Sequence, residues 1–204
     1  MARIHNTTVT PTKLELLAAW LPRQPWHEGD GSGLRRAGGF RLEDPEGEVG
    51  IEFMVVGSGD GHYLVPMSYR GAPLDGADDA LIGTSEHGVL GKRWVYDAVR
   101  DPVAVAQLVA FMRGEAPAHS QHLDGELDPS VHGKLAAGAP VADFRAVDGP
   151  TGTEVTVEPG GPTLRVHRRI APGTVDEDAV GHVTAVVVRG EGEPGRGVYV
   201  TARA

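Results

Sequence analysis

Two neighbouring apolar runs indicate the fold of this chain: Val49-Gly50-Ile51-Glu52-Phe53-Met54-Val55-Val56 and, after a short break, Tyr63-Leu64-Val65-Pro66-Met67-Ser68-Tyr69-Arg70. The first run is rich in β-branched and aromatic residues, which favour strands. The break between the runs, Gly57-Ser58-Gly59-Asp60-Gly61, has the composition of a turn. We therefore predict a β-hairpin and expect most other apolar segments to cover it.

Helices are predicted on both sides of this hairpin. Thr10 or Thr12 is placed to cap a helix that closes at Pro22. A second helix is predicted to start at Asp101-Pro102, because proline is favoured at the first helical position. Its apolar stripe consists of Val103, Val105, Ala106, Leu108, Val109 and Phe111. We expect this helix to pack on the hairpin.

The second half of the chain reads as mainly β. Glycine or proline turns separate the five segments expected to be strands, namely 141–146, 153–158, 163–170, 182–189 and 197–204. The fold class predicted from these patterns is α+β, with an antiparallel sheet flanked by a few helices and then a β-rich part. We predict a domain at 1–115, a polar linker at 116–140 and a second domain at 141–204.

Composition limits the classes of function. With 40% hydrophobic residues among 204, the chain has enough apolar side chains for a packed core. A net charge of -9 opposes a phosphate backbone, so we expect no nucleic-acid partner. No apolar run is long enough for a membrane span and the N-terminus lacks the pattern of a signal peptide. We expect a cytoplasmic protein without a membrane partner, and the absence of cysteine excludes thiolate catalysis.

Two sets of side chains are candidate sites. Trp20 and Trp26 flank a proline-broken segment and either hold the helix end against the sheet, which we favour, or stack on a ligand. His119, His122 and His132 lie among carboxylates and offer ligands for zinc or another divalent ion. The alternative for the histidines is a solvated acidic linker, which we favour because nothing there indicates a helix that would fix two ligands on one face.

Three stretches, taken in order, resemble the N-terminal part of maltokinases and glucosamine kinases. Leu21-Pro22-Arg23-Gln24-Pro25-Trp26 is similar to a signature of the family's cap subdomain. Residues 63–70, with Tyr96-Asp97-Ala98 to Asp101-Pro102, resemble the strand and following helix of the same cap. The stretch from Thr163 to Gly173 is similar to a strand of the kinase-like small lobe, and Arg165 stands where the family has its nucleotide lysine.

The resemblance implies a cap followed by a reduced small lobe. Arg165, Arg168 and Arg169 would then be the ligand-binding residues of that lobe, unless they only protect a solvated strand edge. The family's catalytic His-Gly-Asp loop and Asp-Phe-Glu metal site have no counterpart here: Asp143-Phe144 is followed by Arg145 and precedes the lobe strand. Phosphoryl transfer requires such carboxylates.

We therefore expect a protein without catalytic residues or cofactor that binds or regulates a partner in carbohydrate metabolism. The expected partners are a sugar kinase or a glucan-metabolising enzyme, a sugar ligand, or a second copy of the chain in a homodimer. One alternative is an accessory subunit of a sugar kinase that binds nucleotide or sugar phosphate through its arginines. A second alternative is a metal-dependent hydrolase built on the histidines.

Overall fold

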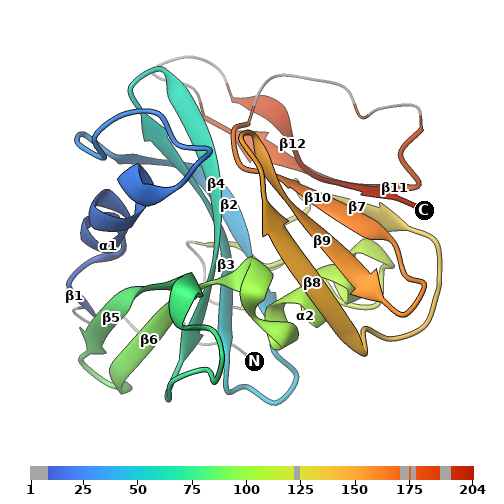
Figure 1. The fold of residues 1–204 in the computed structure, drawn as a ribbon, viewed down its shortest axis with the longest axis horizontal. Coiled ribbons are helices and arrows are strands. Elements are labelled where there is room, and N and C mark those ends of the chain that lie inside the picture. Colours follow the sequence, from blue (N-terminus) through green and yellow to red (C-terminus); the bar gives the residue numbers. More distant parts are fainter. Residues whose placement is uncertain (1–8, 122–124, 171–174, 176–177, 189–193) are drawn as a thin grey trace.

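The computed structural model describes residues 9–121, 125–170, 175, 178–188 and 194–204 (Figure 1). Its helices and strands are β1 (Val9–Thr10), α1 (Lys13–Trp20), β2 (Arg35–Glu43), β3 (Gly50–Ser58), β4 (Gly61–Arg70), β5 (Leu81–His87), β6 (Gly91–Asp97), α2 (Pro102–Met112), β7 (His132–Leu135), β8 (Asp143–Asp148), β9 (Gly152–Glu158), β10 (Thr163–His167), β11 (Gly181–Val187) and β12 (Gly195–Arg203). The α+β class with an antiparallel sheet is confirmed. No helix in these described ranges is long and apolar enough to cross a lipid bilayer.

The predicted hairpin is confirmed as the pair of β3 and β4. The two strands pair without a register shift from Gly50 opposite Tyr69 to Ser58 opposite Gly61. Gly59 in the turn has a φ of 54°, a conformation that glycine adopts without steric cost. Every residue of β3 after Gly50 is buried, which is expected when both faces of a strand are covered.

Strands β1 to β6 form what we call the N-terminal sheet, in the order β1-β5-β6-β4-β3-β2. Helix α1 lies on its outer face (Figure 1). Thr12 caps this helix: its Oγ1 accepts from Glu15 N–H, while Glu15 Oε2 accepts from Thr12 N–H. Leu17 and Trp20 then point into a core with Met54 and Val56.

Strands β7 to β12 form the C-terminal sheet, in the order β8-β9-β10-β12-β11, with β7 also pairing with β11. The two named sheets are parts of one continuous sheet, joined where Val187 of β11 pairs with Gly38 of β2. A Cβ on Gly38 would lie 2.7 Å from the carbonyl oxygen of Val186, so this close approach requires glycine.

Helix α2 lies between the two sheets (Figure 1). Asp101 caps it by accepting from Val103 N–H over 3.0 Å, and Pro102 occupies its first turn, as predicted. Its buried residues belong to the larger core, together with Phe53 and Val55 of the N-terminal sheet and Val155 and others of the C-terminal sheet. The predicted packing of α2 on the hairpin is confirmed.

The segment 116–140 contributes to both sheets. His119 pairs with Arg41 of β2 through two main-chain hydrogen bonds of 2.9 Å. Ala118 and Val131 are buried in the core between the sheets. Further along, β7 pairs with β11. The division into two domains and a linker stays a prediction.

Candidate functional site

The two tryptophans at the end of α1 lie inside the core of the N-terminal sheet. Trp20 is 3% exposed and Trp26 is 2% exposed. Their rings meet edge to face with centroids 5.7 Å apart, in the same core cluster as Leu17 and Met54. The rings therefore fill the space between α1 and the sheet and present no open face to solvent.

Arg168, one of the predicted ligand-binding arginines, lies at the contact between the two sheets. Its side chain is fully buried, and its guanidinium lies 4.9 Å from the ring centroid of Trp26. Nη2 donates to Asp97 Oδ2 over 2.5 Å, and Nε donates to Thr153 Oγ1 over 2.7 Å. We call Trp26, Asp97, Thr153 and Arg168 the Arg168 junction. It connects the end of β6 and the beginning of β9 with the residue that follows β10.

The electrostatics of the Arg168 junction are those of a buried ion pair. Burial raises the pKa of Asp97 above its ordinary value, and the adjacent charge of Arg168 opposes that rise. Arg168 Nη1 and Asp97 Oδ1 have no hydrogen-bond partner among the described residues. A guanidinium stacked on an indole and paired with a buried carboxylate is fixed in position. Chemically, the arrangement holds the sheets together and leaves no donor directed at solvent.

Main-chain contacts extend this attachment. Leu64 N–H donates to the carbonyl of Arg168, and Ile170 N–H donates to the carbonyl of His62, each over 2.8 Å. Tyr63 and Arg169 form the corresponding bridge. The residues that follow β10 therefore continue beside the first half of β4.

The other two predicted arginines lie apart from Arg168 and nearer to solvent. Arg165 donates to Thr151 Oγ1 over 2.8 Å and lies 3.4 Å from a carboxylate oxygen of Glu154. Arg169 pairs with Glu28 over 2.7 Å, with its side chain 48% exposed. Each of the three guanidinium groups thus has its own set of partners, and they do not converge on one anion site.

The predicted metal ligands are separated in the structure. His119 Nε2 lies 3.8 Å from Glu43 Oε1 beside β2, whereas His132 begins β7 on the C-terminal sheet. His122 lies outside the described residues. Within the described parts of the chain, no group of three or more histidines and carboxylates is arranged to hold a metal ion.

A buried carboxylate that the sequence analysis did not single out lies on β3. Glu52 is 2% exposed and accepts from Lys13 Nζ over 2.5 Å, from the Tyr69 hydroxyl over 2.7 Å and from Gln121 Nε2 over 2.9 Å. Burial alone would raise the pKa of Glu52, but Lys13, Tyr69 and Arg36 bring it below the ordinary value. Glu52 therefore remains ionised and ties α1, β4 and the segment after Ala118 together.

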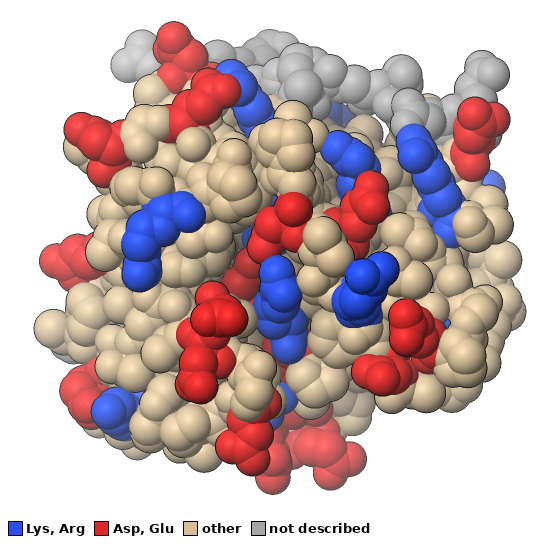
Figure 2. Space-filling view, in the orientation of Figure 1, with Lys and Arg blue, Asp and Glu red and all other residues tan. Residues whose placement is uncertain are grey.

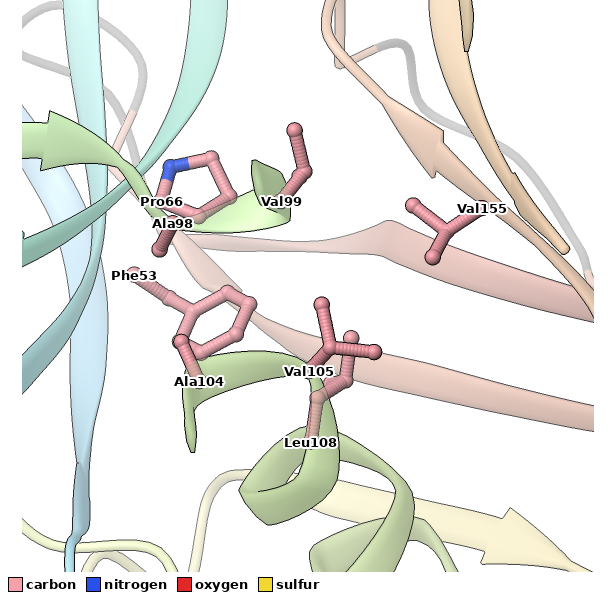
Figure 3. A pocket seen from close by; sticks show the side chains of 8 residues that line it. All are labelled: Phe53, Pro66, Ala98, Val99, Ala104, Val105, Leu108 and Val155. Carbon is pink, nitrogen blue, oxygen red and sulfur yellow. The ribbon is translucent and has the colours of Figure 1, made fainter. Parts of the chain in front are cut away.

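A small apolar cavity opens between α2 and the two sheets (Figure 3). Phe53, Pro66 and Val155 approach it from three strands, and Val105 and Leu108 approach it from α2. Its volume is about 10 Å³, which is the space of a single water molecule. The cavity is too small for a sugar or a nucleotide.

Charges on the face drawn in Figure 2 are mixed: lysine and arginine side chains lie among aspartates and glutamates. Several charged side chains of the described residues form ion pairs: Arg100 Nη2 and Asp148 Oδ2, for example, lie 2.9 Å apart. Arg70 and Asp101 form a two-pronged pair with both distances at 2.7 Å.

The part of the chain that carries Trp26, Asp97 and Asp101 is similar to a known protein family. Residues 20–101 match the family model of the maltokinase N-terminal cap domain. This confirms the resemblance for about two fifths of the 204 residues. We call residues 20–101 the cap segment; it runs from Trp20, the last residue of α1, to Asp101, the residue before α2. No curated protein matches the chain.

Sequence signals for the burial of Glu52, which was missed, and of Arg168, whose role was predicted differently, are present in the chain. Glu52 interrupts an otherwise apolar run and shares strand parity with Met54 and Val56, which marks it as a buried charge. Arg168 shares parity with Leu164 and Val166, which both face the core. Alternation along β10 therefore distinguishes Arg168 from Arg165 and Arg169.

Proposed function

We propose that this chain is a non-catalytic binding or regulatory factor related to the maltokinase cap, acting in the metabolism of maltose, glucosamine or α-glucans. The cap segment recognises a protein partner, such as a sugar kinase or a glucan-metabolising enzyme. Residues 141–204 form a reduced relative of the kinase small lobe. The match of residues 20–101 supports the relation to maltokinases.

The observation that carries this proposal is the burial of Arg168. An arginine that binds a nucleotide must direct its guanidinium at a phosphate. The guanidinium of Arg168 is instead bonded to Asp97 and Thr153 and covered by Trp26. This supports a role for Arg168 in attaching the cap segment to the C-terminal sheet.

The first experiment tests the purified full chain for phosphate transfer from ATP to maltose and to glucosamine, alone and mixed with a maltokinase. We expect no transfer by the chain alone, a saturable complex with the enzyme, and a change in the enzyme's rate when the chain is added. Transfer by the chain alone at an enzymatic rate would overturn the proposal. Absence of both a complex and a rate change with sugar kinases and glucan-metabolising enzymes would do the same.

A second candidate, an accessory subunit that binds nucleotide or sugar phosphate, is favoured by the surface position of two arginines. The side chains of Arg165 and Arg169 are 38% and 48% exposed. Their carboxylate partners lie at the surface, where ion pairs contribute little free energy and exchange readily for phosphate. This candidate predicts ATP binding that is lost in the double variant Arg165→Ala, Arg169→Ala, and phosphate transfer only in a mixture with a catalytic chain.

A further inference from the structure

Strand β8 is the last strand of the C-terminal sheet, and its outer edge is open. It pairs with β9 on one side, and no described strand pairs with its other side (Figure 1). Phe144 lies opposite Val157 of β9, whose own main-chain groups bond on the far side, to Pro162 and Gly161. Because the bonds of an antiparallel ladder alternate between the two sides of a strand, the N–H and C=O of Phe144 point out of the sheet edge.

The side chains along this edge limit which strand can pair with it. Phe144 is half-buried and packs against the core between the sheets, and its N–H donates to Asp143 Oδ1 over 2.8 Å. Arg145 is exposed on the same face of the strand as Asp143 and forms no ion pair with any described residue. Charged side chains on an edge oppose pairing with arbitrary strands. A pairing strand must therefore displace the Asp143 carboxylate from Phe144 and offer it a positive charge.

A second copy of β8 meets this requirement. Two identical edges that pair antiparallel are related by a two-fold axis, and their main-chain bonds join residues that point outward. When the pairing is centred on Phe144, Asp143 of each copy lies opposite Arg145 of the other. The two Phe144 residues then exchange a pair of main-chain hydrogen bonds, and their rings lie next to each other on the core side of the joined sheet.

The neighbouring registers lack this complementarity. Moving the centre by one residue places either Arg145 opposite Arg145 or Asp143 opposite Asp143, and like charges directly opposite each other are destabilising. A register centred on Ala146 places Arg145 opposite Val147 and leaves both charges without a counterpart. The charges of β8 therefore favour a second copy of the same strand and a single register.

We propose that the chain forms a two-fold symmetric dimer in which the β8 strands of two copies pair edge to edge, centred on Phe144. The C-terminal sheets of the two copies then form one continuous sheet. The dimer goes beyond the proposed function and does not depend on it, because the cap segment takes no part in the interface. One strand from each copy makes a small interface, so we expect a dissociation constant in the micromolar range.

Sedimentation velocity of the full chain, from micromolar to millimolar concentration, tests the dimer. We expect the wild type to shift from monomer to dimer as the concentration rises. Arg145→Asp and Asp143→Arg each place like charges opposite each other, so each should weaken self-association at least about tenfold. An equimolar mixture of these two variants should dimerise as the wild type does, because every 143–145 pair then joins opposite charges. Lys134→Asp is the matched control, with the same charge change at an exposed position of β7, and should dimerise normally.

Thermal unfolding of each variant establishes that it is folded. Ala146→Pro provides a second measurement: it removes an N–H that points out of the edge, so it should block the dimer without breaking a bond inside the chain. A wild type that stays monomeric at millimolar concentration would overturn the proposal. Self-association that is unchanged in Arg145→Asp, or a mixture of the two charge variants that stays monomeric, would overturn it as well. None of these results bears on the proposed function, which fails separately if the chain binds no enzyme.

Discussion

Arg168 and Asp97 bury opposite charges at the contact between the two sheets, so the free energy of each depends on the other. Removing one partner leaves the other charge without compensation in a site closed to water. Replacing both by uncharged side chains removes the desolvation cost together with the attraction. Single and double substitutions should therefore behave very differently at this position.

For the Arg168 junction, we expect Arg168→Met to lower the free energy of unfolding by about 3 to 5 kcal/mol. The double variant Arg168→Met, Asp97→Asn should recover a large part of that loss, because no charge is then left unpaired. Chemical denaturation of the two variants and the wild type measures both quantities. Equal stability of the single variant and the wild type would show that the ion pair is not buried in solution.

At Asp101, the pKa of a buried carboxyl group makes stability depend on pH. Burial alone would raise this pKa, but the paired guanidinium of Arg70 and the hydrogen bond from Val103 N–H bring it below the ordinary value of 3.8. A lowered pKa in the folded state contributes stability above the unfolded pKa, and that stability is lost as pH falls through the folded pKa. Asp101→Asn should cost about 2 kcal/mol at neutral pH.

The cost of Asp101→Asn should shrink as the pH is lowered below about 4, because the wild-type carboxyl group then becomes protonated as well. Urea denaturation of both proteins at a series of pH values measures the difference. A difference that stays constant from neutral pH down to strongly acidic pH would contradict the assignment of a lowered pKa to Asp101.

Among the elements, α1 is short, and its stability depends on its ends and on its packing. It has eight residues, so the reciprocal contact between Thr12 and Glu15 satisfies a large share of its free N–H groups. We expect Thr12→Ala to lower the free energy of unfolding by about 1 kcal/mol, whereas Thr12→Ser should be nearly neutral. Thermal unfolding compares them; equal losses in both variants would assign the effect to the threonine methyl group instead of the cap.

Among the helices and strands, the sequence predicts those whose formation depends on residues close together in the chain. The hairpin follows from β-branched runs around glycine, and α2 follows from Asp101 and Pro102. The strand β5 was not predicted, because its residues Leu81–His87 are mixed in polarity and it is held by pairing with β1 and β6. Strand β7 lies in the polar segment after His119 and forms by pairing with β11.

The candidate site was predictable only in part, because strand pairing, and not local sequence, brings its residues together. The sequence identified Arg168 and the tryptophans as notable, but their partners Asp97 and Thr153 lie 71 and 15 residues from Arg168 along the chain. Gln121 donates to Glu52 and lies beside Gly39, and only the pairing of strands brings these residues near one another. Contacts of this range depend on the sheet register, which no local pattern specifies.

For the whole molecule, the shared core between the sheets predicts a single cooperative unfolding transition. The tryptophans Trp20, Trp26 and Trp94 all belong to the N-terminal sheet and its covering segments, whereas strands of both sheets contribute to circular dichroism. Fluorescence and circular dichroism should therefore give coincident curves. An earlier loss of the dichroism signal, with fluorescence retained, would show that the C-terminal sheet unfolds on its own.

The complete burial of β3 has an evolutionary consequence. In a strand with one solvent-exposed face, every second residue can be substituted at little cost in stability, but residues Ile51 to Ser58 offer no such positions. Strand β9, in which exposed or half-buried residues alternate with buried ones from Thr153 onward, has that freedom. In related chains, substitutions should therefore accumulate first at the exposed positions of β9 and last in β3, whose residues should change most slowly.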